Sequence, residues 1–332
     1  MSDVKTTLAD DGRTARPAAD PDGPAPGARR PTTTDGPERR PLWLLLPTSV
    51  LLVIIVVVPL VLAVWVSLLD LNQYTLRQWL AAPFIALGNY VEALSGPTIG
   101  SSALHSLWVS VSFSLITTVI AAPLGVLAAL TVNSSFRGRA VVRSLYLLPY
   151  VLPAFVTALL WRLMFLNHGL ASRVLADVGI GSDTTYWLLG GHAFWAMVIT
   201  DVWASWAFIY IMTLAGLQTI PSELYEAADV DGTSWTAKLR HVVLPNLRGV
   251  LGLALLLSTI HHFNNFTLPY VMFGTPPPAE VTVLPVNVYV TSFQVFRFGL
   301  GATMSILTLV IMLIPGYLYF RALRLGSSNG VQ

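Results

Sequence analysis

The sequence predicts an all-α integral membrane protein with six transmembrane helices. Of its 332 residues, 54% are apolar and only 11% are charged, whereas about a quarter of the residues of a soluble globular protein are charged. The mean hydropathy is +0.66. Six separate stretches reach the roughly 20 predominantly apolar residues that a helix needs to cross a bilayer. These observations exclude a single water-soluble domain.

The first 41 residues differ from the rest of the chain. They hold seven of the 17 acidic and seven of the 19 basic residues, and they are rich in Pro, Ala, Gly and Thr. Such a segment buries too little apolar surface to offset its ordering entropy, so residues 1–41 are expected to be a disordered cytoplasmic tail. They are not a signal peptide, because the apolar run that follows is too long. The membrane domain is expected over residues 42–325, with a C-terminal tail at 326–332.

The predicted spans follow one another along the membrane domain. They cover about residues 43–69, 104–132, 142–166, 193–216, 249–271 and 299–320. Pro59, Pro123, Pro153 and Pro315 lie inside them. These prolines do not exclude a span, because neighbouring helices can satisfy the carbonyl groups that a proline leaves free.

The basic residues between the spans predict the orientation in the membrane. Fifteen lie on the side of the N-terminal tail, among them Arg143, Arg240 and Arg321, and three lie on the opposite side. Cytoplasmic loops carry the excess of Lys and Arg. Both termini and the loop at 217–248 are therefore expected in the cytoplasm, with the chain passing several times through a bacterial-type inner membrane.

Other functions leave traces that this sequence lacks. There is no cysteine, which excludes disulfides, iron–sulfur clusters and cysteine nucleophiles. The two lysines are Lys5 and Lys238, and neither ends the Gly-x-x-x-x-Gly-Lys-Ser/Thr pattern of a phosphate-binding loop. The net charge of +2 is too small to indicate a nucleic-acid partner.

The loop at 217–248 predicts a short helix–turn–helix. Ser222 is a favourable N-cap, and Glu223 and Glu226 are expected in the first turn, where they favour the helix dipole. Gly232 suits a left-handed C-cap. Ser234 can cap a second helix, which Pro245 is expected to end. From this pattern alone, the hairpin is either a docking element for another protein or a structured connector.

The same loop carries a specific motif. It reads Glu226-Ala227-Ala228, three residues, Gly232, nine residues, then Val242-Val243-Leu244-Pro245. This resembles the EAA loop of binding-protein-dependent ABC importer permeases, Glu-Ala-Ala-x3-Gly-x9-Ile-x-Leu-Pro, with valine for isoleucine as the only substitution.

The resemblance implies the type I permease fold and the function of a transport permease that is not itself an enzyme. It implies that the loop docks on an ATPase subunit through Glu226, Ala227, Ala228, Gly232, Leu244 and Pro245. It also implies the partners: a second permease subunit, two ABC ATPase subunits and an extracytoplasmic solute-binding protein, around a chain embedded in the lipid bilayer. ATP and Mg would be bound by the ATPase, and this chain would need no cofactor of its own.

More of the chain resembles the carbohydrate-uptake branch of these permeases. The matching segments are Leu87-Gly88-Asn89-Tyr90, Arg143 with Leu148-Pro149, and Leu217-Gln218-x-Ile220-Pro221. Within that branch, the long first span, Leu45-Leu46-Pro47 and Phe263-Asn264-Asn265-Phe266 look more like the larger maltose-permease subunit than like its partner. The resemblance implies a sugar or sugar-like solute as the cargo.

Ionisable side chains inside spans are costly and therefore indicate function. Asp201 in span four and His261 in span five each share a helical face with small or polar residues at helical spacing, and such faces suit a hydroxyl-rich solute. The resemblance assigns sugar contacts to the same positions and adds Tyr150. The candidate substrate residues are Asp201, Ala204, Ser205, Phe208, Ser258, His261, His262, Asn265 and Tyr150. An asparagine is usual in the family at the position of Asp201, so a maltose-type cargo is not implied.

Three alternatives remain open. Asp201 can be a structural partner of a histidine, and because His261 and His262 point about 100° apart, only one of them can face it fully. A proton-coupled secondary transporter would use Asp201 with a histidine, but it leaves the EAA loop unexplained and no second six-span repeat is apparent. An intramembrane metal enzyme would use all three as ligands, but no His-Glu-x-x-His pattern is present.

Overall fold

Helices make up almost all of the structure, a computed structural model that describes residues 46–96, 102–182 and 184–328. Within these ranges the only β-type pairing is an isolated bridge between Leu69 and Phe84. The predicted tail at 1–41 lies outside them. Contacts divide the chain into an N-terminal unit that ends at Leu51 and a main unit that begins at Leu52.

Five helices in the described part of the chain are long and apolar enough to cross a membrane. They are Leu46–Ser67 (α1 Leu46–Leu52, η2 Val53–Val57 and α2 Val58–Ser67), α4 (Ala103–Asn133), α8 (Gly191–Leu217), Trp235–Phe263 (α10 Trp235–Lys238, η4 Leu239–Val243 and α11 Leu244–Phe263) and the greater part of α14 (Phe298–Ser328). A bent pair of helices makes a sixth span if its two members are counted as one. The predicted all-α fold is confirmed.

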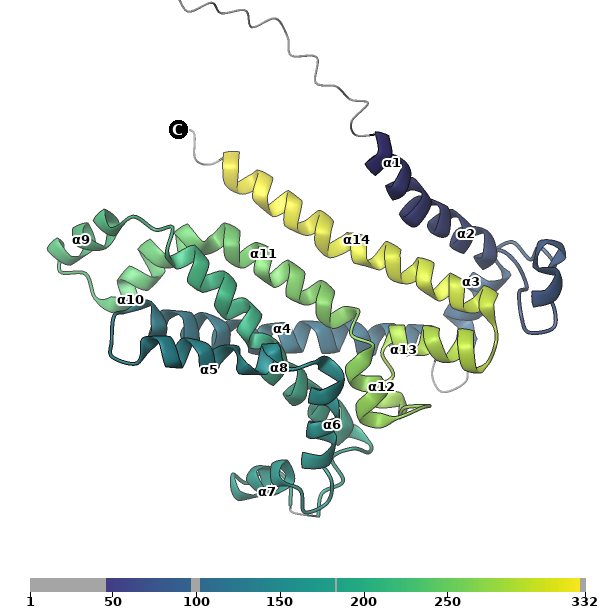
Figure 1. The fold of residues 1–332 in the computed structure, drawn as a ribbon, viewed down its shortest axis with the longest axis horizontal. Coiled ribbons are helices and arrows are strands. Elements are labelled where there is room, and N and C mark those ends of the chain that lie inside the picture. Colours follow the sequence, from purple (N-terminus) through teal and green to yellow (C-terminus); the bar gives the residue numbers. More distant parts are fainter. Residues whose placement is uncertain (1–45, 97–101, 183, 329–332) are drawn as a thin grey trace, which may run out of the picture. The chain divides into compact units, whose positions relative to one another are not determined.

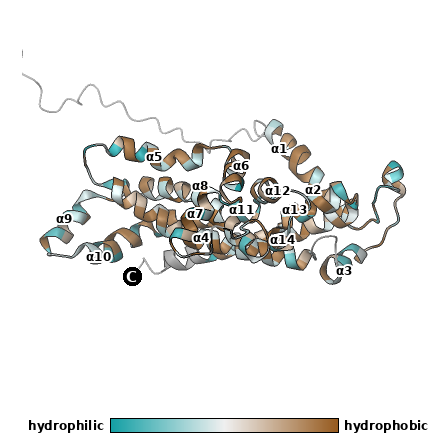
Figure 2. Cartoon of the chain, turned by 90° about the horizontal axis from the view of Figure 1, so that it is seen from below, coloured by the Kyte–Doolittle hydropathy of each residue, from teal (hydrophilic) through white to brown (hydrophobic). Residues whose placement is uncertain are grey.

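Shorter helices connect the spans. They are η3 (Leu76–Ala81), α3 (Gly88–Ser95), α7 (Leu170–Asp177), α9 (Ser222–Val230), α12 (Thr267–Phe273), η5 (Ala279–Val281), α13 (Leu284–Tyr289) and η6 (Val290–Gln294). Within the main unit, α9 and α10 lie at one end of the long helices and α3 lies at the opposite end (Figure 1). The long helices are mostly hydrophobic, whereas hydrophilic residues gather on the α9–α10 hairpin and around α3 (Figure 2).

The third span differs from the continuous helix predicted over 142–166. It consists of α5 (Arg139–Val151) and α6 (Ala154–Met164), which meet at an angle of 89°. The break falls at Leu152, whose backbone is extended, and at Pro153, the N-cap of α6. A proline disfavours the helical conformation of the residue before it. Pro153 therefore interrupts the span instead of being accommodated inside it.

The fifth span also differs from its predicted range of 249–271. Pro245 was expected to end the helix of the loop, but that helix continues from Trp235 to Phe263. Pro245 has no amide hydrogen and cannot donate to the carbonyl four residues earlier. Just before Pro245 the helix forms a wider, π-helical turn, η4, in which the Leu244 amide donates to the Leu239 carbonyl. The chain then leaves the helix at Asn264 and re-enters one at α12.

Among the described spans, helices α4 and α8 share the most extensive contact. A Cβ atom on Gly125 would lie 2.7 Å from the carbonyl oxygen of Trp206 and 2.8 Å from the backbone nitrogen of Tyr210. Only glycine fits at this crossing, and the neighbouring Ala121 and Ala128 are buried beside it. Small residues that let backbones approach are the usual basis of helix association in a membrane.

The carbonyl groups at the end of the first span are satisfied by side chains from distant segments. The amide nitrogen of Asn89 donates to the carbonyls of Ser67 and Leu69, at 2.9 Å each. The Thr303 hydroxyl in α14 also donates to the Ser67 carbonyl, at 3.1 Å. The motif residue Asn89 therefore ties the first span to the segment that follows it.

An ion pair closes the same end of the main unit. Arg297, just before α14, donates to Glu92 in α3 through both terminal nitrogens, with Nη2 at 2.6 Å from Oε2. The hydrogen bond from Arg297, together with its charge, lowers the pKa of Glu92, and the same hydrogen bond raises the pKa of Arg297. Both side chains are more than a third exposed, so solvent weakens the pair.

Glu92→Gln is predicted to destabilise the purified protein by about 0.5–1 kcal/mol at neutral pH. A carboxylate with a lowered pKa stabilises the fold above its unfolded pKa, and this contribution disappears as the pH falls through its folded pKa. The difference in melting temperature between the wild type and the variant should thus shrink as the pH is lowered from neutral into the acidic range. Glu280→Gln, at an exposed glutamate with no ion pair among the described residues, is the matched control. A difference that stays constant or grows on acidification would contradict the prediction.

Candidate substrate cavity and coupling hairpin

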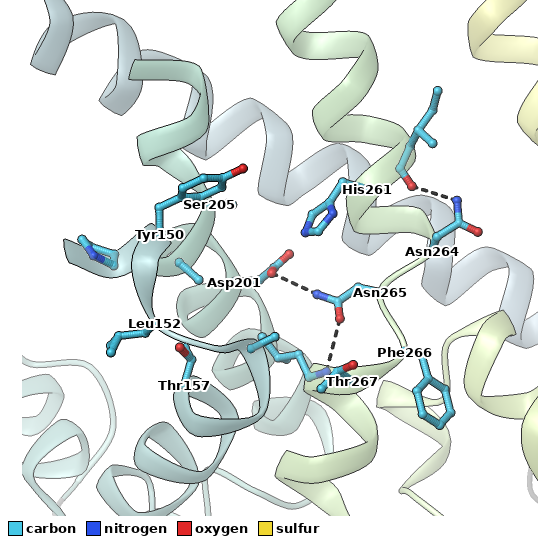
Figure 3. Close-up of a pocket in the computed structure, with 15 residues that line it drawn as sticks. Tyr150, Leu152, Thr157, Asp201, Ser205, His261, Asn264, Asn265, Phe266 and Thr267 are labelled. Atoms are coloured by element: carbon cyan, nitrogen blue, oxygen red, sulfur yellow. Dashed lines mark hydrogen bonds between the residues drawn. The ribbon is translucent and has the colours of Figure 1, made fainter. Parts of the chain in front are cut away.

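A cavity of about 420 Å³ opens where the third and fifth spans are interrupted (Figure 3). Its lining comes from the end of α5, from α6, from the middle of α8, from the end of α11, and from the turn that leads into α12. Helix breaks inside a membrane are tolerated where they are buried in protein or line a cavity. Both of the interruptions in this bundle meet that condition.

Asp201 lies at the centre of the polar part of the cavity. Its side chain is 4% exposed. Oδ1 accepts a hydrogen bond of 3.0 Å from Asn265 Nδ2, and Oδ2 lies 2.6 Å from His262 Nδ1. His262 is itself 1% exposed and presents an edge to the ring of Phe113. A buried carboxylate needs such partners, because an unpaired charge is costly in a membrane.

Asn265 fixes the interruption in the fifth span. Its carbonyl oxygen accepts a hydrogen bond of 3.2 Å from the Leu268 amide, in the first turn of α12, while its amide nitrogen binds Asp201. Both bonds leave the same side-chain amide, one toward Asp201 and the other toward the backbone at the start of α12 (Figure 3). Asn265 therefore caps a helix and holds the acidic residue at the same time.

Two further polar groups of the lining are buried without a partner. Among the described residues, neither the Thr157 hydroxyl in α6 nor the Ser205 hydroxyl in α8 has a hydrogen-bond partner. Native proteins seldom leave buried polar atoms unpaired unless a ligand or water completes them. With the exposed imidazole of His261, these groups can bind a solute that carries several hydroxyls.

The structure brings together six of the nine candidate substrate residues. Those that line the cavity are Tyr150, Asp201, Ala204, Ser205, His261 and Asn265. Phe208 packs against the ring of Tyr150, with centroids 6.3 Å apart, Ser258 is buried, and His262 pairs with Asp201. These three support the lining and do not form part of it.

The two histidines play different parts, as their 100° separation on the helix predicts. His262 faces Asp201 and His261 faces the cavity. Sequence reasoning did not select Thr157 or Asn264, which also line the cavity. Asn264 is part of the segment Phe263–Phe266 that resembles the maltose-permease subunit and is adjacent to Asn265, so its position alone could have indicated a place in the lining. Within the described ranges, no three His, Asp or Glu side chains gather into a metal-binding group.

The second candidate site is the hairpin formed by α9 and α10. Helix α9 begins one residue away from the predicted position: Pro221 is its N-cap, and the Ser222 side chain makes no capping bond. Glu223 is in the first turn, but Glu226 lies beyond it. Gly232 has the left-handed backbone expected of it, with φ of +66°. Ser234 caps α10 as predicted, accepting from the Ala237 amide.

The hairpin presents part of its motif to solvent. Glu226 and Ala227 are exposed, whereas Ala228 is buried against the body of the protein. An ion pair between Asp229 and Lys238 joins α9 to α10. Val230 at the tip is 88% exposed. The hairpin thus exposes an acidic group, Glu226, beside small and apolar residues.

Comparison with known proteins agrees with this architecture. Residues 121–324 match the family described as binding-protein-dependent transport system inner membrane component. The trehalose/maltose transport system permease protein of Thermococcus litoralis is 32% identical over 280 residues, which cover 84% of this chain and 91% of that protein. The sulfoquinovosyl glycerol transport system permease protein of Agrobacterium fabrum is 30% identical over 283 residues, with coverage of 85% and 89%.

Among solved structures, a bacterial ABC transporter involved in the import of the acidic polysaccharide alginate has a similar fold. One of its chains superposes with a TM-score of 0.68 at 20% identity, covering 84% of this chain and 96% of that chain. The resemblance inferred from the EAA loop is thus confirmed. The chain belongs to the family of binding-protein-dependent transport system inner membrane components, the permease subunits of ABC importers, which are transport components and not enzymes.

Proposed function

We propose that this permease moves a neutral, hydroxyl-rich solute of the sugar class through the cavity around Asp201, driven by ATPase subunits that dock on the α9–α10 hairpin. The observation that carries the proposal is the polar cavity at the two helix breaks. It offers a carboxylate, an imidazole and two unpartnered hydroxyls inside an otherwise apolar bundle. Ligand sites combine an apolar lining with a few such polar groups.

The charge of the lining argues against an anionic cargo. Asp201 and His261 line the cavity, but no lysine or arginine of the described chain does. The two relatives are named for solutes of different charge. Trehalose and maltose, in the name of the Thermococcus litoralis protein, are neutral, whereas sulfoquinovosyl glycerol, in the name of the Agrobacterium fabrum protein, carries a sulfonate. A buried carboxylate would repel an anion, so a neutral sugar fits this chain better.

The coupling proposal rests on the exposed part of the motif. Glu226 can pair with a basic residue of the ATPase, Ala227 permits close approach, and Gly232 permits the turn. Leu244 and Pro245 are exposed at the start of α11, beside the proposed docking surface. The excess of basic residues on this side supports a cytoplasmic position for the hairpin and for both termini.

The remaining partners follow from the same proposal. The chain would pair with a second permease in the inner membrane and receive its solute from an extracytoplasmic binding protein, as the family description suggests. ATP and Mg would be bound by the two ATPase subunits.

Glu226→Lys is predicted to reduce the amount of ATPase that co-purifies with the permease by about tenfold, the loss expected when one charged hydrogen bond is removed. Glu223→Lys is the matched control, because Glu223 is an exposed glutamate on the same helix. The measurement is the ratio of ATPase to permease after affinity purification, with membrane insertion checked separately. An unchanged ratio for Glu226→Lys, or an equal loss for both variants, would contradict the coupling assignment.

Asp201→Ala is predicted to lower the uptake of neutral sugars at least tenfold while the complex still assembles. The change removes the acceptor of the Asn265 bond and leaves His262 unpaired, a loss of about 1.5–3 kcal/mol for a bond to a charged group. Uptake of labelled maltose and trehalose into proteoliposomes measures the effect. Asp201→Asn keeps an oxygen for Asn265 and should retain more uptake than Asp201→Ala. Equal, undiminished uptake by both variants would refute the site.

A further inference from the structure

A second cavity, of about 270 Å³, lies between the α9–α10 hairpin and the ends of two spans. One of its walls is formed by the ends of α4 and α8, and the other by α9, α10 and the π-helical turn η4. It shares no lining residue with the cavity at Asp201. A water molecule needs only about 10–15 Å³ of such space, so the cavity has room for a small ligand or a head group. An occupant would touch the hairpin and two spans at once.

The buried part of this cavity is apolar. Leu217 at the end of α8 and Val243 in η4 are buried, and Leu130 and Leu239 are partly buried. The same four residues belong to the hydrophobic core that packs the hairpin against the spans. An occupant with an apolar part would extend this core.

Hydrogen-bond donors make up the polar part of the lining. The Tyr225 hydroxyl is buried and has no hydrogen-bond partner among the described residues. Burial raises the pKa of Tyr225, so the phenol stays protonated at neutral pH and can donate. Asn133 and Trp235 add N–H donors, and no aspartate or glutamate of the described chain lines the cavity. Such a lining suits an occupant that accepts hydrogen bonds.

Lys238 places a positive charge in the lining. Its side chain is 19% exposed, whereas that of Asp229, its ion-pair partner, is 68% exposed and does not line the cavity. An ammonium group has three donors, and Asp229 takes one of them. Because an exposed ion pair contributes little, an anion in the cavity can bind Lys238 beside or in place of Asp229. The cavity therefore favours an anionic occupant.

The cavity lies where the apolar spans end. Its walls include Asn133, the last residue of α4, and Leu217, the last residue of α8. At this level the hydrocarbon of a bilayer gives way to head groups, and aromatic residues such as Tyr225 and Trp235 are typical of that boundary. Basic pockets between spans on the cytoplasmic side bind anionic head groups. The excess of basic residues on this side would attract such lipids.

We propose that the cavity binds the phosphate of an amphiphilic anion through Lys238 and Tyr225, and that its occupant is an anionic phospholipid of the cytoplasmic leaflet. The proposal rests on the cytoplasmic position of the hairpin in the proposed function, but not on the cargo. The phosphate meets the donors, and the apolar part of the lipid meets Leu130 and Leu217. The lipid thereby holds α9, which carries Glu226, against the ends of α4 and α8. A soluble phosphate ester offers the same phosphate without the apolar part.

Two adjacent serines after α4 permit a direct test. Ser134→Cys places a thiol in the lining, and Ser135→Cys, at an exposed residue outside the lining, is the matched control. The sequence contains no other cysteine. Each variant is assembled into the complete importer in phosphatidylcholine nanodiscs with increasing phosphatidylglycerol, and the rate of its modification by an uncharged maleimide is measured. A second series uses phosphatidylcholine alone with added glycerol phosphate.

Phosphatidylglycerol should slow the modification of Ser134→Cys by about fivefold at four times its half-saturating content. It should slow Ser135→Cys far less, because that thiol lies outside the cavity. Glycerol phosphate should protect neither thiol at concentrations up to the millimolar range, because it lacks the apolar part.

Variants of the lining should shift the amount of lipid that is needed. In the Ser134→Cys background, Lys238→Gln should raise the half-saturating content of phosphatidylglycerol about tenfold and Tyr225→Phe about fivefold, the losses expected for a charged and a neutral hydrogen bond. Asp229→Asn breaks the same ion pair as Lys238→Gln but keeps the cation, so it should retain protection. Arg240→Gln, at an exposed residue of η4 outside the lining, should retain it too.

Equal slowing of Ser134→Cys and Ser135→Cys would reveal a general effect of surface charge and overturn the site, as would equal losses for Lys238→Gln and Arg240→Gln. Protection by glycerol phosphate without protection by phosphatidylglycerol would overturn the lipid as the occupant. If Ser134→Cys never reacts in phosphatidylcholine while Ser135→Cys does, a partner subunit covers the cavity and the proposal fails. The proposed uptake site is unaffected by any of these results, since no sugar takes part in the experiment.

Discussion

The hydrogen bond between Asn265 and Asp201 is the interaction on which the polar centre of this protein depends. A span that breaks inside a bilayer must satisfy its free backbone groups within the protein. Asn265 does this for α12 by accepting from the Leu268 amide, and it anchors itself by donating to Asp201. The interruption that makes room for a solute is therefore stabilised by residues that the solute would touch. Loss of this bond would leave His262 as the one remaining partner of the carboxylate among the described residues and would release the anchor of Asn265.

The apolar spans and the α9–α10 hairpin were predictable because their signals are local. Apolar stretches of sufficient length occur as helices, and the glycine at 232 with its positive φ and the cap at Ser234 appear where the sequence places them. A bend within a span could not be predicted in the same way, because a straight helix and two helices that meet at 89° have the same mean hydropathy. Pro153 breaks its span and Pro245 does not, since the π-helical turn η4 absorbs the second proline. Only the packing around each proline decides between these outcomes.

The candidate site was predictable wherever a helix is straight, because residues at helical spacing then lie on one face. The spacing from Asp201 to Ser205 holds, since α8 is unbroken there. In the fifth span the helix ends at Phe263, so Asn265 reaches Asp201 from a turn, while His262 is directed inward. Thr157 could not be found because it enters the cavity only through the bend at Pro153. The presence of an aspartate at 201 also accounts for the histidine at 262. A buried carboxylate requires a charged or polar partner, whereas an asparagine at 201 would not require one.

The two helices that hold the Asn265–Asp201 bond are joined again at their other ends. Helix α8 ends at Leu217 and leads into α9, and the helix that begins at Trp235 runs without a break to Phe263, two residues before Asn265. Its 29 residues span about 43 Å. The Asp229–Lys238 pair ties α9 to the base of this helix. Helix α8 and the helix Trp235–Phe263 are thus connected twice, by the α9–α10 hairpin at one end and by the buried Asn265–Asp201 bond toward the other. Because the helix is unbroken from Trp235 to Phe263, a force on α9 that changes the separation of these helices is expected to reach the bond between Asn265 and Asp201.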